Sequence, residues 1–346
     1  IQPSYAEAFN NIGNSYKELS DFDNAVISYK KAIDLAPTYT DALCNLGICW
    51  SLQEKYEQAE AAYKKALEID PSNIKSSLLL ASSNIKNKEF QKGLSIVNKL
   101  IFENPSNFEA LHIAGLCFRG LGQIDKASDY FIKSLRINPD NPDALNSLGL
   151  LQLQQKRFKE AIKVFERVLK LDKTRVDSYT NLGKAFIDNG NITKAEFILK
   201  QALNIDCSHI PTIRNLFDVY MVKNDLRKAE TFVRTVLDQQ PNLPEALNAL
   251  GSIYEKKGEF EEAENLIMKA LENDKNLVKA KINLATIYQH CKKNEDANKI
   301  YADLEKDGHT DPNMFFNSAN IYLVQGHYKE GWEKHEYRWK VDPLNK

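Results

Sequence analysis

The sequence has no excess of charge of either sign and no long apolar run. Its 46 lysine and arginine residues are balanced by 47 aspartate and glutamate residues, which leaves a net charge of −1 over 346 residues. A protein whose main partner is nucleic acid usually carries a basic excess that neutralises phosphates, so nucleic acid is not expected as the main partner. No stretch approaches the roughly 20 apolar residues that cross a bilayer, so no membrane span is expected.

Cysteine is scarce, and its spacing indicates neither a disulfide framework nor a metal site. The five cysteines include no C-x-x-C pair, and their odd number leaves at least one thiol without an internal partner. This usage favours a reduced, intracellular setting, and we expect a cytoplasmic location. The N-terminus lacks a signal-peptide pattern, but the first residue is Ile1 and not methionine, so the native start is expected further upstream.

Motifs that carry common enzyme chemistry are also missing. There is no G-x-x-x-x-G-K-[ST] phosphate loop, no G-x-S-x-G turn and no Cys/His cluster with zinc spacing. The segment that starts at His335 begins like H-E-x-x-H but has Trp339 at the place of the second zinc ligand. We therefore expect this chain not to be an enzyme by itself, and we expect no cofactor and no metal site.

A period of 34 residues runs through the whole sequence. Laid out in rows of 34, the chain gives ten rows without an insertion or deletion. The rows begin at Ala6, Thr40, Ile74, Phe108, Pro142, Val176, Ile210, Pro244, Val278 and Pro312. A fixed period of this length is typical of repeat proteins in which each repeat is a pair of helices.

Small residues recur at two positions of each row, counted from its first residue. Position 20 is alanine or glycine in all ten rows, and position 8 is glycine or alanine in every row except the seventh, which has Phe217. Helices can approach closely where side chains are this small, so positions 8 and 20 are predicted to face each other.

Glycine and proline mark the turns. Gly122, Gly190, Gly258 and Gly326 occupy position 15, where the end of a helix favours a left-handed residue. All eleven prolines fall at positions 1, 2 or 32, which suit a helix start or the loop before it. Each row is therefore predicted to form two antiparallel helices, at about positions 1–14 and 15–28.

Large apolar residues at positions 4, 7, 11 and 24 complete a pattern that resembles the tetratricopeptide repeat over essentially the whole chain. The resemblance implies an all-α fold, a right-handed superhelical solenoid of ten 34-residue helix-turn-helix repeats whose first helices line a concave surface. Residues 1–5 are interpreted as the end of a preceding repeat and residues 6–311 as nine repeats. Residues 312–346 are interpreted as an atypical tenth repeat or capping helix, with a possible junction to a further C-terminal domain.

Asparagine recurs on the predicted concave surface, which should be lined by positions 2, 5, 6, 9, 12 and 13 of each first helix. Position 6 is asparagine in six rows: Asn11, Asn45, Asn181, Asn215, Asn283 and Asn317. A carboxamide can pair with the C=O and N–H of an extended peptide whatever side chains that peptide carries. The six residues resemble the asparagine ladder of O-GlcNAc transferase-like proteins, which implies binding of substrate polypeptide. The alternative is that each asparagine bonds a neighbouring repeat and only orders the stack.

Rows two to five present an apolar patch at positions 5, 6 and 9 of the same predicted surface. Its residues are Ile48, Leu78, Leu79, Ile113, Leu116 and Leu150. We interpret this patch as an apolar anchor site beside the polar ladder, so that the groove has two zones. The alternative is that a variant third repeat shifts its helix and buries these side chains.

The last row departs from the others after its turn. His335 and Arg338 replace the apolar residues expected at positions 24 and 27, and Trp332 and Trp339 are two of the three tryptophans in the chain. One interpretation is a polar capping helix, which solenoids need at their ends. The other is that this G-W-x-x-x-E-x-R-W segment resembles the closing repeat of bacterial proteins in which tetratricopeptide repeats lead into a glycosyltransferase domain.

These patterns predict a module that binds a protein or peptide along a concave groove. Two contexts stay open: the substrate-recruiting part of a repeat-linked glycosyltransferase, and a free-standing scaffold or adaptor. The oligomeric state does not follow from the sequence.

Overall fold

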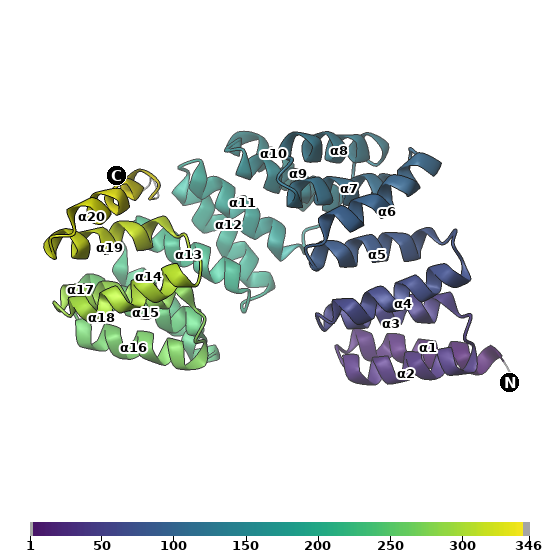
Figure 1. Ribbon diagram of the computed structural model, residues 1–346, viewed down its shortest axis with the longest axis horizontal. Coiled ribbons are helices and arrows are strands. Elements are labelled where there is room, and N and C mark those ends of the chain that lie inside the picture. The colour runs from purple at the N-terminus through teal and green to yellow at the C-terminus, as the bar shows by residue number, and fades with distance from the viewer. Residues whose placement is uncertain (1–2, 342–346) are drawn as a thin grey trace. The chain divides into compact units, whose positions relative to one another are not determined.

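The computed structural model describes residues 3–341, and every regular element in that range is helical (Figure 1). Within it, 20 α-helices joined by short turns are followed by one 3-10 helix. The prediction of an all-α fold built from helix pairs is confirmed. None of the helices in this part of the chain is long and apolar enough to cross a membrane.

The chain divides into two compact units, Ile1–Lys173 and Thr174–Lys346, which correspond to rows one to five and six to ten. Unit 1 contains α1 (Pro3–Glu18), α2 (Phe22–Leu35), α3 (Thr40–Leu52), α4 (Tyr56–Ile69), α5 (Ile74–Lys86), α6 (Phe90–Glu103), α7 (Phe108–Gly120), α8 (Ile124–Ile137), α9 (Pro142–Gln154) and α10 (Phe158–Leu171). Unit 2 contains α11 (Val176–Asp188), α12 (Ile192–Ile205), α13 (Ile210–Val222), α14 (Leu226–Gln239), α15 (Pro244–Lys257), α16 (Phe260–Asn273), α17 (Val278–His290), α18 (Asn294–Lys306), α19 (Pro312–Val324), α20 (Tyr328–His335) and η1 (Glu336–Trp339).

The second helix of each row starts later than predicted. In row two, α3 covers positions 1–13 and α4 covers positions 17–30, not 15–28. The reason lies at Glu54, position 15, which has a φ of 61° and so cannot belong to a right-handed helix. The backbone N–H of the next residue, Lys55, donates to the carbonyl oxygen of Trp50 at 2.8 Å and closes the end of α3.

Position 15 is left-handed in all ten rows, and not only in the four rows that have glycine there. The residues other than glycine have φ between 53° and 61° and are Ser20, Glu54, Lys88, Lys156, Asn224 and Lys292. For these residues the Cβ atom makes the left-handed region unfavourable by about 1–2 kcal/mol. The turn geometry is therefore imposed by packing of the two helices, and it overrides the preference of the local residue.

Replacing Lys88 with glycine is expected to stabilise unit 1 by about 0.5–1 kcal/mol, because the steric cost at φ 60° is removed and only partly offset by the greater freedom of the unfolded chain. Urea unfolding followed by circular dichroism measures the change. The matched control is Lys99→Gly in the exposed interior of α6, which should instead destabilise by about 1 kcal/mol. Equal losses in the two variants would contradict the role assigned to position 15.

The two helices of a row meet where the small residues lie. A Cβ atom on Gly47 would lie 2.4 Å from Cε1 of Tyr63, the position-24 ring of the same row. Position 20 also lies close to position 8, because a Cβ on Gly93 would lie 3.1 Å from the backbone oxygen of Ala81 at position 8. The predicted close approach of positions 8 and 20 is confirmed, and the position-24 side chain fills the space beside them.

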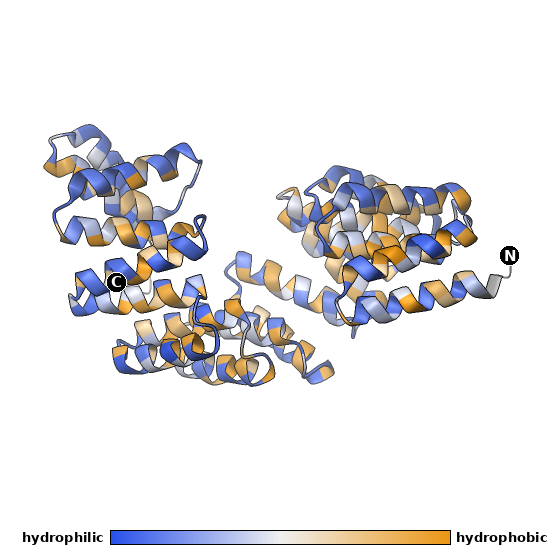
Figure 2. Ribbon diagram, turned by 90° about the horizontal axis from the view of Figure 1, so that it is seen from below, coloured by the Kyte–Doolittle hydropathy of each residue, from blue (hydrophilic) through white to orange (hydrophobic). Residues whose placement is uncertain are grey.

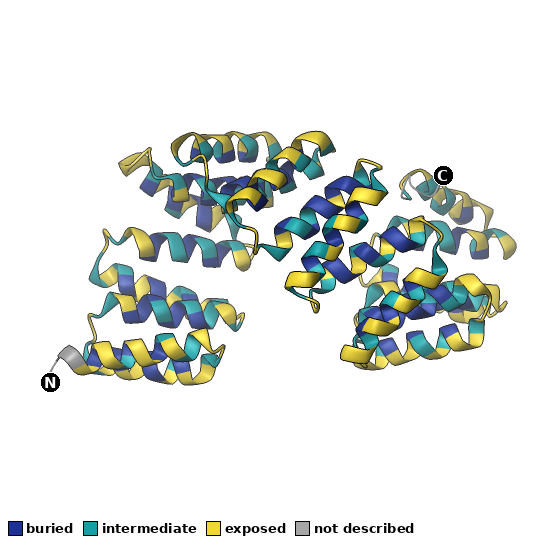
Figure 3. Cartoon of the chain, turned by 180° about the vertical axis from the view of Figure 1, so that it is seen from behind, coloured by how far each residue is buried: buried dark blue, intermediate teal, exposed yellow. Residues whose placement is uncertain are grey.

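Figure 3 shows buried residues on the sides of the helices that face neighbouring helices, and exposed residues on the other sides. Apolar residues follow the same stripes in Figure 2. In row seven the large and the small residue are exchanged between the two helices: Phe217 occupies position 8, which is small in the other rows, and the fully buried Val233 occupies position 24. Phe217 is half-buried, and the exchange therefore puts an aromatic ring on the first helix of that row.

The second helix of row ten, α20, has 8 residues and passes into η1. Phe315 of α19 packs on Tyr337 with ring centroids 4.5 Å apart, while Trp332 and Trp339 are 57% and 63% exposed. At the other end, α1 begins at Pro3. Residues 1–2 and 342–346 lie outside the described residues, so the interpretations of residues 1–5 and 312–346 as junctions stay predictions.

Candidate functional site

A groove of about 500 Å³ lies within unit 2, on the first helices of rows seven to ten. In rows eight to ten, every lining residue on a helix occupies position 2, 5, 6, 9, 12 or 13, the positions predicted to form the concave surface. Leu277 and Asp311, at position 34 of their rows, complete the lining. The inner face predicted from helical periodicity is therefore hollowed in this unit.

Two of the six ladder asparagines, Asn283 and Asn317, line the groove. Nδ2 of Asn283 donates to Oδ1 of Asn248 and to Oγ of Ser252, each at 2.9 Å. Nδ2 of Asn317 donates to Oγ1 of Thr286 at 3.2 Å. In each case the position-6 amide reaches back to position 5 or 9 of the preceding row, so its donors help to join successive repeats.

The same bonding occurs in unit 1. Nδ2 of Asn45 donates to Oδ1 of Asn10 at 2.9 Å and to Oδ1 of Asn14 at 3.3 Å. Asn11 is exposed on α1, and Asn181 and Asn215 are half-buried outside the groove. The recurring asparagines thus occupy equivalent places, but the hydrogen bonds described for three of them are used within the stack.

The six residues of the apolar patch all lie in unit 1, where they are buried or half-buried. Ile113 is 8% exposed and belongs to the core cluster around Phe131, so it has little surface to offer a ligand. Leu78 and Leu116 pack against the same cluster, and Leu79 packs against the neighbouring ones. Ile48 and Leu150 are half-buried on α3 and α9. The surface that this patch presents is therefore smaller than the sequence pattern indicates.

The groove of unit 2 contains an apolar strip that the asparagine and leucine patterns do not indicate. Ile213, Phe217 and Met221 follow one another at intervals of four on α13 and all line the groove. Phe217 and Met221 are half-buried, whereas Ile213 is only 4% exposed, so the first two supply most of the apolar surface. Ala249 lines it on α15, in a row where position 6 has no asparagine. The exceptional Phe217 at position 8 was the available signal, because a large residue there cannot lie between the two helices of its row.

Charged residues surround this strip. Four acidic and three basic side chains line the groove, and Arg214 lies 4.0 Å from Glu245. Burial raises the pKa of Glu255 above its ordinary value, and the positive charges of His290 and Lys256 only partly oppose that effect. Nε2 of His290 lies 3.5 Å from Oε1 of Glu255. Glu255 is therefore an acidic group that lacks full solvation.

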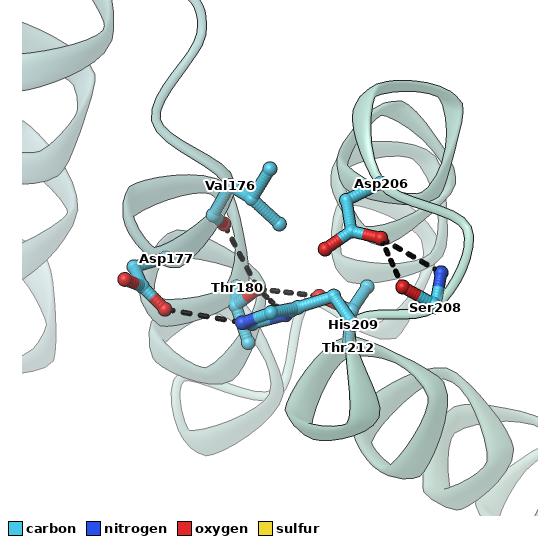
Figure 4. A network of polar contacts seen from close by, with 7 residues as sticks. All are labelled: Val176, Asp177, Thr180, Asp206, Ser208, His209 and Thr212. Carbon is cyan, nitrogen blue, oxygen red and sulfur yellow. Dashed lines mark hydrogen bonds and ion pairs between the residues drawn. The ribbon is translucent and has the colours of Figure 1, made fainter. Parts of the chain in front are cut away.

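A polar network joins rows six and seven near the start of α13 (Figure 4). Nε2 of His209 lies 3.1 Å from Oδ1 of Asp177, and Nδ1 lies 2.7 Å from Oγ1 of Thr212, which is 2.5 Å from Oγ1 of Thr180. The arrangement resembles an acid–histidine–hydroxyl triad. However, Thr212 is fully buried and Thr180 is 5% exposed, so no substrate can reach either hydroxyl. The network holds the two rows together.

Within residues 3–341, no three His, Cys, Asp or Glu side chains are grouped so that they could hold a metal ion. Cys44, Cys49 and Cys117 are buried free thiols, and burial raises the pKa of Cys117 to about 12. A thiol with such a high pKa is neutral at physiological pH and is a poor nucleophile.

Comparisons with known proteins agree with this geometry. Models described as tetratricopeptide repeat match residues 6–39, 40–73, 106–174, 152–211, 186–253 and 244–277. No curated protein matches the sequence.

Solved structures share the fold at low sequence identity. Yeast Tom70 has a TM-score of 0.59 at 15% identity, over 98% of this chain and 92% of that one. The structure of the APC/C hetero-tetramer Cut9-Hcn1 has a TM-score of 0.57 at 18% identity, over 91% of this chain and 76% of that one. A repeat protein of the same kind from Parabacteroides merdae has a TM-score of 0.53 at 19% identity, over 71% of this chain and 97% of that one.

Proposed function

Because the chain belongs to the tetratricopeptide repeat family, we propose that it is a binding module that captures an extended polypeptide segment along the inner face of its first helices. The observation that carries the proposal is the groove of unit 2, whose lining positions recur from row to row. An extended peptide has backbone groups at regular intervals, and a groove with a repeated lining can meet them at regular intervals too.

In this proposal the ladder asparagines contact the peptide backbone, but with fewer of their polar groups than the sequence pattern indicates. Both N–H groups of Asn283 have acceptors within the stack, on Asn248 and Ser252. A carboxamide oxygen has two lone pairs, so the group left for a ligand is the oxygen. We propose that these oxygens accept hydrogen bonds from the peptide N–H groups, while the amide nitrogens order the repeats.

The test uses a variant in which Asn181, Asn215, Asn283 and Asn317 are all replaced by alanine. Peptides are first selected on the wild-type chain from a random 12-residue display library, and their affinities are then measured by fluorescence anisotropy. Each lost hydrogen bond contributes about 0.5–1.5 kcal/mol, so we expect the affinity to fall at least tenfold.

The matched control replaces four exposed asparagines of unit 2 outside the groove, and its affinity should not change. These residues are Asn204, Asn242, Asn273 and Asn276. Thermal unfolding of both variants separates the two roles of the ladder. Unchanged peptide affinity together with a lowered melting temperature in the ladder variant would contradict peptide binding and leave only the ordering of the stack.

The apolar patch is the second zone in this proposal, as an anchor site on unit 1. Its half-buried members Ile48 and Leu150 carry that role, because Ile113 is in the core. In the same anisotropy assay, peptides that lose affinity on Ile48→Asn or Leu150→Asn would support an anchor site there. Full affinity of every selected peptide for both variants would remove this zone from the proposal.

We further propose a link to a glycosyltransferase, which is favoured by the segment from Gly331 to Trp339 and by the resemblance of the asparagine ladder. Its two tryptophans are more than half exposed, so they have surface available for a following element. The native gene sequence beyond Lys346 decides the matter. A following α/β domain would support a substrate-recruiting role, and an immediate stop codon would leave a scaffold or adaptor.

A further inference from the structure

We infer that the groove of unit 2 selects peptides that carry a large apolar side chain with a lysine or arginine close to it in sequence. This inference rests on the proposed function and specifies its ligand. The apolar side chain is received by the strip on α13, and the basic side chain by Glu255 on α15.

The apolar half follows from the size exchange in row seven. In rows with glycine at position 8, the large apolar side chain at position 24 covers that glycine from the second helix, as Tyr63 covers Gly47. In row seven the ring belongs to Phe217 on the first helix, and it lines the groove between Ile213 and Met221. An aromatic ring that stays half-buried in a groove gains contact area when an apolar side chain covers it.

The neighbouring row leaves room for such a side chain. Position 6 of row eight is Ala249, so the asparagine ladder is interrupted beside Phe217. Ile282, at position 5 of row nine, also lines the groove, but it is only 6% exposed. The apolar surface beside the interrupted ladder is therefore mainly that of Phe217 and Met221, while Asn283 and Asn317 lie further along the groove in rows nine and ten.

The basic half follows from the charges. Four carboxylates line the groove, on Asp218, Glu245, Glu255 and Asp311. Asp311 caps α19 by accepting from the backbone N–H of Asn313 at 2.8 Å, and Glu245 lies beside Arg214. Glu255 has His290 at 3.5 Å and the positive charge of Lys256 nearby, but these only partly offset the effect of its burial.

Glu255 occupies position 12 of row eight, as Met221 does in row seven, and both side chains line the groove. A cation on the ligand would compensate the burial of this carboxylate. The lysines of the groove, Lys256 and Lys279, are exposed and can turn their ammonium groups toward water.

The experiment starts from the same random 12-residue display library, selected on the full chain. The expected consensus has a phenylalanine, leucine or methionine with a lysine or arginine within four residues of it. A synthetic consensus peptide is then titrated against Glu255→Gln and Phe217→Ala. Each variant should bind it about tenfold more weakly, and Glu255→Gln should bind the peptide and its Lys→Gln analogue equally well.

Two controls keep the result interpretable. Phe197→Ala removes a ring that is 63% exposed on α12, outside the groove, and should leave the affinity unchanged.

The second control concerns the fold of the variants. Glu255→Gln keeps the shape of the side chain, and circular dichroism verifies the fold of every variant. If Phe217→Ala does not fold, Phe217→Met tests the same contact with a smaller change in volume.

The outcomes separate this inference from the function on which it rests. Peptides that bind with full affinity to Glu255→Gln and Phe217→Ala, or that have an acidic consensus, would overturn the apolar–basic specificity. In that case, a loss of affinity in the ladder variant would still support peptide capture. If no peptide is enriched on the wild-type chain, the specificity and the proposed function both fail.

Discussion

Replacing Phe131 with alanine is expected to lower the free energy of unfolding of unit 1 by about 3–5 kcal/mol. The ring is fully buried and lies against Gly115, where a Cβ would come within 2.5 Å of Cε1. It is also the position-24 residue around which Leu151, Ile113 and Phe118 cluster. Removal of the ring leaves a cavity that α7 and α8 cannot close, because Gly115 has no side chain to move into it.

The effect should stay local. In a repeat protein, each row is stabilised mainly by its neighbours, so the rows around α7 and α8 should open before the rest. Amide exchange in α7 and α8 measures the local opening. The fluorescence of Trp50 on α3, after Trp332 and Trp339 have been changed to phenylalanine, follows the urea unfolding of the earlier rows of unit 1. The matched control is Phe102→Ala, whose ring is 87% exposed, and it should leave the stability unchanged. Equal effects of Phe131→Ala and Phe102→Ala would contradict the packing described for position 24.

Lowering the pH from 7 to 4 is expected to cost unit 1 about 2–3 kcal/mol through a single residue, His112. Burial lowers its pKa to about 4; the charge of Arg119 acts in the same direction, and the charge of Asp143 opposes both. Its Nε2 lies 2.9 Å from Oγ of Ser147, and its ring packs on Phe131 with centroids 5.7 Å apart. The folded state therefore holds a neutral imidazole.

The sign follows from the two pKa values. In the unfolded chain a histidine has a pKa of about 6.5, so it takes up a proton before the folded state does. The stabilisation is complete above about pH 6.5, falls as the pH drops toward the folded-state value of about 4, and is absent below it.

The comparison for this prediction is His112→Asn. Rows one, five and eight have asparagine at the equivalent position 5, so the variant keeps a polar partner for Ser147 and removes the titration. The difference in unfolding free energy between wild type and His112→Asn, measured from pH 7 to pH 4 with the Trp50 probe, should change by the stated amount. A constant difference would show that His112 is not buried in neutral form.

Most of the fold could be predicted, because the restrictions act within one repeat and recur. Positions 8, 15, 20 and 24 are subject to the same packing in each row. A residue pattern that is weak evidence in a single row therefore becomes strong evidence when it recurs in ten rows. The boundaries of the second helices were displaced by two residues. Glycine marks the turn in only four rows, and residues such as Lys88 and Glu54 adopt the left-handed conformation without any sequence signal.

The candidate site was less predictable, because its chemistry depends on contacts between rows. Helical periodicity correctly placed Asn283 and Asn317 on the inner face. It did not reveal that Asn248, Ser252 and Thr286 accept hydrogen bonds from their amides. These partners lie about one repeat away in sequence, and whether they lie within bonding distance depends on how closely two first helices approach.

The sequence by itself determined the helical repeat, its period and the face that each first helix turns inward, since the spacing of small and large side chains depends on local geometry alone. The tertiary structure decided what that face offers. Ile113 lies in the core, and the amide N–H groups of Asn45, Asn283 and Asn317 donate to neighbouring repeats. The ring of Phe217 and the carboxylate of Glu255 line the same groove. The physical reason is that burial and hydrogen-bond pairing depend on the distance between neighbouring repeats, which the pattern of a single repeat does not specify.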